Sequence, residues 1–188
     1  LRAKDLRELS LACFAFNGLQ TAFTSYYVLY LTALNYDLAA AGLMFAIAMV
    51  IAVPMRIFWG WLSSGRVAPR RVMAGLSLGM AASAALMSLY GADWHPLLIA
   101  AIATVMSATA MSWHGVLLSE AARLAPPGMR GAATGGVLSF GQVGAFILPV
   151  IYAAQLAVTN SHGMGFLLCG APALVVGIVL WRASARAV

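Results

Sequence analysis

The chain has 188 residues, of which 63% are hydrophobic and 9% are charged. Soluble domains usually carry about 45–50% apolar and about 25% charged residues, so this composition excludes a water-soluble fold. The formal net charge is +6, but the basic residues stand between apolar runs and form no basic face, which excludes nucleic acid as a partner. A bilayer span needs roughly 20 residues, so the length allows about six spans in a lipid bilayer.

The apolar runs, taken in chain order, predict an all-α polytopic membrane protein. Six spans fit the sequence, at about residues 11–34, 38–61, 72–90, 97–118, 132–158 and 164–181. The turn from Asn35 to Asp37 divides the first two, and Pro126 to Gly128 force a loop after the fourth. No strand pattern competes, because a membrane sheet must close into a barrel with alternating polar positions. We expect one six-helix bundle over residues 1–188.

All eleven Lys and Arg residues fall on one predicted side of the membrane. They are Arg2, Lys4, Arg7, Arg56, Arg66, Arg70, Arg71, Arg123, Arg130, Arg182 and Arg186. Positive residues are retained in the cytoplasm during insertion, so we expect both termini there. The abundance of Arg and Ala indicates a bacterial protein, which places the chain in the inner (plasma) membrane. Because the chain opens on Leu1 rather than Met, we expect it to be part of a longer protein.

The loop after the second predicted span carries a motif. It reads Gly60, Trp61, Leu62, Ser63, Ser64, Gly65, Arg66, Val67, Ala68, Pro69, Arg70, Arg71. This loop resembles the signature of the major facilitator superfamily (MFS), which is Gly, any residue, Leu, Ala or Ser, Asp, Arg, any residue, Gly and two basic residues. Ser64 and Gly65 stand in place of the Asp, and Ala68 replaces the second Gly. By this resemblance, Gly60 permits close helix packing and the arginines hold helix ends.

A second motif precedes the fifth predicted span. Residues 126–135 are similar to the loop before the eleventh helix of the superfamily. The helix that follows carries five expected packing positions, Gly135, Gly136, Gly141, Gly144 and Pro149. In the superfamily, such a helix packs against the opposite half of the transporter.

The resemblance covers essentially the whole chain and implies a function. It implies one six-helix half of the MFS fold, itself a 3+3 inverted repeat, that moves a small solute by alternating access in a secondary transporter. The fourth span lacks the Arg that often marks helix four of proton antiporters, so we favour the C-terminal half. The partner is then the missing N-terminal six-helix half. A homodimeric transporter built from a second copy and a non-transporting membrane receptor are the alternatives.

Polar residues in the first predicted span mark a candidate substrate cavity, because the first and fourth helices of each half line that cavity in the superfamily. Spacings of i, i+3, i+4 and i+7 put four of them on one helical face, namely Asn17, Gln20, Thr21 and Thr24. Tyr27 extends this face, and Gln20 falls near mid-depth, where such transporters commonly bind substrate. The alternative is that these side chains only form hydrogen bonds between helices.

The fourth predicted span contributes Ser107, Trp113 and His114 to the same cavity. Ser107 and His114 are seven residues apart, so a continuous helix presents them on nearly the same face. His114 is the only histidine within a predicted span. It either accepts a proton or binds solute, or else it satisfies a neighbouring helix, and the sequence leaves both open.

Glu120, at the inner end of the fourth span, is the acidic member of a candidate gating motif. We predict that it pairs with Arg130 or with the loop from Arg66 to Arg71 and so latches one transport state. The remaining members of the motif are Gly60, Ser64, Arg66, Arg70 and Arg71. Arg56 lies about a turn and a half before the basic loop, and we expect its side chain to extend to the inner surface.

An enzyme is a poor fit to this sequence. Intramembrane catalysis requires a nucleophile and base, or a set of metal ligands, that converge at depth. Ser112 and His114 are two residues apart and point to different faces of a helix. His95 and His162 lie in predicted outer loops without a matching ligand set. We therefore expect no catalytic residues, no metal and no cofactor.

Overall fold

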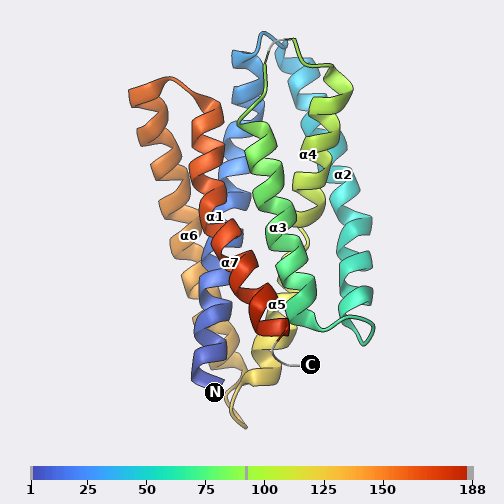
Figure 1. Cartoon of the computed structure of the whole chain (residues 1–188), viewed down its shortest axis with the longest axis vertical. Helices are drawn as coiled ribbons and strands as arrows, with labels where there is room; N and C mark the ends of the chain where they lie inside the picture. Colours follow the sequence, from blue (N-terminus) through green and yellow to red (C-terminus); the bar gives the residue numbers. More distant parts are fainter. Residues whose placement is uncertain (1, 92, 186–188) are drawn as a thin grey trace.

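The computed structural model describes residues 2–91 and 93–185, with side chains described from 4 to 91 and from 93 to 184. Every regular element within that range is helical. The helices are α1 (Arg2–Ala33), α2 (Leu38–Ser63), α3 (Pro69–Met87), α4 (Pro96–Ala110), α5 (Trp113–Leu124), α6 (Arg130–Thr159) and α7 (His162–Ala185). Figure 1 shows them running side by side along the long axis. The predicted all-α class is confirmed.

Four helical segments in the described part of the chain are long and apolar enough to cross a bilayer. They are Leu38–Ser63, Pro96–Leu124, Arg130–Thr159 and His162–Ser184. The second of these contains both α4 and α5. Of the six predicted spans, α1 and α3 do not reach the same hydropathy, because charged residues occupy the beginning of both helices and small or polar residues recur within them. Both bury a broad face against neighbouring helices, where small and polar side chains pack as well as large apolar ones.

The helices pack in three main pairs, α1 with α6, α3 with α7 and α2 with α4. Small residues bring the backbones of the first two pairs together. Gly144 of α6 lies against the backbone of Phe14 in α1, and Gly170 of α7 lies against Ala84 in α3. The buried Ser77 of α3 also donates a 2.6 Å hydrogen bond to the Ala173 carbonyl of α7. Close backbone approach of this kind is how membrane helices associate without a hydrophobic driving force.

The fourth predicted span is not one continuous helix. Met111 and Ser112 form a turn between α4 and α5, although neither is a helix breaker. The first helix also begins nine residues before the predicted span, because Arg2 to Ser10 continue it. α1 begins and α7 ends at the same end of the bundle, and the α2–α3 and α5–α6 loops lie at that end too (Figure 1).

Candidate functional site

The candidate site lies at the break between α4 and α5. Its backbone tightens there, since the N–H of Ser112 bonds the carbonyl of Thr109, three residues back, at 3.3 Å. Such a turn interrupts the regular ladder of α-helical bonds and frees carbonyls at the break. Ser112 is also the residue before α5, and its hydroxyl makes no capping hydrogen bond.

Side chains from α2 bind the carbonyls at this break. Arg56 Nε donates to the Met111 carbonyl at 2.6 Å, and Trp59 Nε1 donates to the Ala108 carbonyl at 3.1 Å. We expected Arg56 only to reach for the inner surface, but its guanidinium instead turns towards α5. The break is therefore bound by side chains of a neighbouring helix, and a side chain that enters the hydrogen-bond ladder is one known cause of a kink.

A cavity of about 440 Å³ opens beside the break. Its polar lining residues come from three helices and the turn, namely Gln20 of α1, Arg56 of α2, Ser112 of the turn and His114 of α5. Gly60 and Gly115 also line it, and an added Cβ at either would meet no atom within 4 Å. The volume falls within the range of about 300–1,000 Å³ that is usual for small-molecule sites.

A hydrogen bond fixes Gln20 at this cavity. Trp113 Nε1 donates to Gln20 Oε1 at 2.9 Å, so α1 and α5 are joined at the site. Trp113 is fully buried, and its ring centroid lies 5.8 Å from that of Phe16 and 3.7 Å from that of His114. Two predicted cavity residues, Gln20 and His114, therefore line the same hollow, and the predicted Trp113 supports both.

The other polar residues predicted on α1 do not line this cavity. Asn17 faces α6, where a Cβ on Gly141 would lie 3.5 Å from its amide nitrogen. The hydroxyls of Thr21 and Thr24 donate to carbonyls of α1 itself, at 2.8 and 3.1 Å, and Thr24 is exposed. Tyr27 is fully buried. The polar residues predicted to share one face of α1 thus contact different partners, namely the cavity, α6 and the carbonyls of α1 itself.

Ser107 does not line the cavity with His114. It is fully buried, and its hydroxyl lies 3.6 Å from the sulfur of Met49 in α2. The prediction that both residues face one cavity is wrong, because it assumed a continuous helix and the turn at Met111 and Ser112 intervenes.

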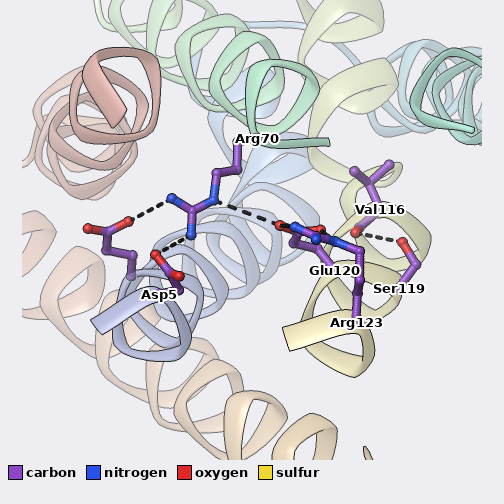
Figure 2. Close-up of polar contacts among 7 residues, drawn as sticks. Asp5, Arg70, Val116, Ser119, Glu120 and Arg123 are labelled. Carbon is purple, nitrogen blue, oxygen red and sulfur yellow. Dashed lines mark hydrogen bonds and ion pairs between the residues drawn. The ribbon is translucent and has the colours of Figure 1, made fainter. Parts of the chain in front are cut away.

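A second polar cluster lies at the end of the bundle where α1 begins and α7 ends, and Figure 2 shows its contacts. Arg70 of α3 reaches Asp5 at 2.5 Å and Glu8 at 3.5 Å, both on α1, and Glu120 of α5 at 3.8 Å. Arg123 also donates two 2.7 Å hydrogen bonds to the carboxylate of Glu120. The Glu120 side chain is only 1% exposed, and Arg70 and Arg123 are the cations that lie against its buried carboxylate. Arg70 thereby joins three helices.

Comparison with known proteins identifies the family. A family model described as Major Facilitator Superfamily matches residues 1–149, which include α1 to α5 and most of α6. The chain belongs to this superfamily. No curated protein matches the chain. Members of the superfamily are membrane transporters rather than enzymes, and the apolar helices described above fit a multi-pass membrane protein.

The superfamily-like motif after α2 contributes one arginine to this second cluster. Of the two partners predicted for Glu120, the structure has Arg70, which belongs to the first turn of α3, and not Arg130, which lies exposed at the start of α6. Arg66 instead lies over the ring of Trp61, 3.8 Å from its centroid.

The other members of the loop motif have separate roles. Ser64 donates from its hydroxyl to the Trp61 carbonyl at 2.8 Å at the end of α2. Arg71 lines a second cavity, of about 390 Å³, beside Arg70. Gly60 has open space around it, so the close helix packing expected there is absent among the described residues.

The glycine-rich helix of the superfamily pattern, α6, packs within this chain. A Cβ on Gly141 or Gly144 would collide with α1, whereas Gly135 and Gly136 face open space. The carbonyl of Pro149 accepts a 3.2 Å hydrogen bond from Tyr26 of α1. We expected these residues to contact the opposite half, but those with close neighbours contact α1.

Sequence reasoning missed several residues of the two clusters. Ser112 was treated only as a poor nucleophile, because nothing in the sequence marks the break before α5. Asp5 and Glu8 were assigned no role, although their spacing of three residues puts both on one helical face. Across the described residues, no cluster of three or more His, Cys, Asp or Glu side chains is arranged to hold a metal ion.

Proposed function

We propose that the chain is the C-terminal six-helix half of a secondary transporter that moves a small solute by alternating access. The observation that carries this proposal is the cavity at the α4–α5 break, which brings polar groups of α1, α2 and α5 together in a bundle of the transporter superfamily. A broken helix at a membrane cavity is a recurrent way to bind solute. In this proposal α1 and α3 also span the bilayer.

The charge distribution supports an orientation in a bacterial inner membrane. The basic loops after α2 and α5 lie at the end of the bundle where α1 begins and α7 ends (Figure 1). Arg186 lies outside the described residues. Because positive residues are retained on the cytoplasmic side, we place both termini in the cytoplasm.

The exposed faces of α2 and α6 support the missing six-helix half as the partner. Large apolar side chains stand exposed on both helices, including Leu43, Val50, Ile57, Phe146 and Val150. Part of this surface faces lipid, and part is available to a second bundle. A second copy of this chain is the competing partner, and the mass of the purified complex separates the two.

Flux measurements on the full-length protein test the function. The protein is reconstituted in vesicles and screened for exchange of radiolabelled solutes, with Gln20→Ala and Thr104→Ala as matched variants. Thr104 bonds a carbonyl of its own helix and does not line the cavity. We expect Gln20→Ala to raise the half-saturating solute concentration about tenfold, because one hydrogen-bonding group is lost. If no solute is transported, the proposal is wrong, and the alternative of a non-transporting membrane receptor is favoured.

We also propose that the second polar cluster is a latch. Arg70 joins α1, α3 and α5 at the inner end, so opening that end separates its partners. Glu120→Gln removes the charge that Arg70 and Arg123 share, and should shift the protein towards the inward-open state. Cysteine accessibility from the inner side measures this balance. Ser119→Ala is the control, because its hydroxyl bonds only the Val116 carbonyl in Figure 2. An unchanged balance in Glu120→Gln contradicts the latch.

A further inference from the structure

Arg56 carries a positive charge at the cavity without a carboxylate partner. It lies seven residues before the end of α2, or about 10 Å along the helix, within a segment apolar enough to cross the bilayer. Its Nε is used by the Met111 carbonyl. The two terminal nitrogens have no hydrogen bond or ion pair within the described chain, and the acid on α5, Glu120, is held by Arg70 and Arg123.

Two further polar groups of the same cavity lack partners. Ser112 is 4% exposed, and its hydroxyl has no hydrogen bond to any described residue. The buried Nδ1 of His114 likewise has none among them. Both residues line the cavity beside Arg56. Buried polar groups without partners cost free energy unless a ligand or water satisfies them, so these two atoms indicate a polar occupant.

The backbone adds to the same preference. α5 is a helix of 12 residues that starts at Trp113, directly beside Ser112, and no side chain caps its N-terminus. His114, Gly115 and Val116 of its first turn line the cavity. Free N–H groups and the helix dipole make such an N-terminus favourable for negative charge. No acidic side chain lines this cavity within the described residues.

We infer that the cavity binds the anionic group of a small solute, a carboxylate or a phosphate, through the Arg56 guanidinium, the Ser112 hydroxyl and the first turn of α5. This inference rests on the proposed transport function and names its substrate class. A guanidinium and a hydroxyl are donors, and charge-assisted bonds from them to an anion are stronger than neutral ones. A cationic solute would be repelled by Arg56, and no acidic side chain among the described lining residues would offset that repulsion.

The experiment uses the full-length protein in phosphatidylcholine nanodiscs. The probes are succinate, inorganic phosphate and uncharged succinamide, and binding is followed by titration of tryptophan fluorescence and by the unfolding temperature. The variants are Arg56→Gln, the charge-conserving Arg56→Lys, and Ser112→Ala. Arg66→Gln is the matched control, because Arg66 lies on Trp61 away from the cavity. A parallel set of nanodiscs contains phosphatidylglycerol.

We expect succinate or phosphate to bind and succinamide not to bind. Arg56→Gln should weaken that binding about 10- to 100-fold, Ser112→Ala about 3- to 10-fold, and Arg66→Gln not at all. Arg56→Lys should retain part of the affinity, which separates lost charge from lost folding. Equal binding by wild type and Arg56→Gln, or no binding of either anion, overturns the inference.

Three further results distinguish a lipid headgroup from a solute as the source of the anion, and distinguish failure of this inference from failure of the proposed transport function. Stabilisation by phosphatidylglycerol alone means that a lipid headgroup occupies the cavity, and the solute inference is then wrong. Flux of neutral solutes that is unaffected in Arg56→Gln overturns the anion class and leaves transport standing. Anion binding through Arg56 without flux of any solute supports the anion site and overturns transport.

Discussion

Substitution of Gly144 by Ala tests how closely α6 packs against α1. A Cβ at this position would lie 2.8 Å from the carbonyl carbon of Phe14 and would also collide with the carbonyl oxygen. Overpacking costs about 1–3 kcal/mol, and these atoms belong to backbone that cannot rotate away, so we take about 3 kcal/mol. The better helix propensity of Ala returns about 1 kcal/mol. The net loss of unfolding free energy is then about 2 kcal/mol.

The neighbouring Gly136 provides an opposite control on the same helix. A Cβ there meets no atom within 4 Å, so Gly136→Ala should stabilise the protein by about 0.5–1 kcal/mol. Both variants of the full-length protein are unfolded from mixed micelles with increasing dodecyl sulfate and followed by tryptophan fluorescence. If Gly144→Ala is as stable as Gly136→Ala, α1 and α6 do not approach as closely as described.

Three further experiments test the two polar clusters and the packing of α1 against α6. Arg70→Gln leaves the acids of α1 and α5 without their shared cation and should lower the free energy of unfolding by about 1–3 kcal/mol. Arg71 has no ion pair in the described chain, so Arg71→Gln should change the free energy of unfolding by less than about 0.5 kcal/mol. The loss in Arg70→Gln should shrink in 1 M salt if like-charge repulsion causes it, and a salt-independent loss contradicts this. Trp113→Phe removes the N–H that binds Gln20 and should cost about 1 kcal/mol in the same unfolding assay, and a double-mutant cycle with Gln20→Leu should show coupling. Cys13 of α1 is fully buried against α6 and should resist a membrane-permeant maleimide until the protein is unfolded. Fast labelling of the native protein would refute this burial.

The helical class and most of the helix order follow from the sequence because they depend on local composition. Apolar runs of about 20 residues between turn residues predict spans, and Asp37 even caps α2 by accepting the Ala40 N–H at 3.0 Å. α1 and α3 show the limit of this argument. Their lower hydropathy reflects packing inside the bundle, which depends on residues far away in the chain.

The candidate site was predicted only in part, because its geometry depends on contacts between helices. The spacing on α1 put Gln20 on one face with three other polar residues, and its position near mid-depth singled it out. His114 was singled out as the only histidine within a predicted span. The bend that brings Ser112 and Arg56 to them has no Pro or Gly at its centre. Its carbonyls are bound instead by Arg56 and Trp59 of α2. The pattern of residues within 97–118 cannot predict a contact with another helix.

The attachment of the α4–α5 break to α2 has a consequence for how the shape of this segment is determined. Trp59 and Arg56 bind the carbonyls of Ala108 and Met111. The residues that hold the break between α4 and α5 therefore belong to a different helix, α2. A synthetic peptide of residues 96–124 has neither donor, and in micelles it is free to form one straight rod. We therefore expect the shape of this segment to depend on its contact with α2, and a shift of α2 would also move Arg56 and Gly60, which line the cavity.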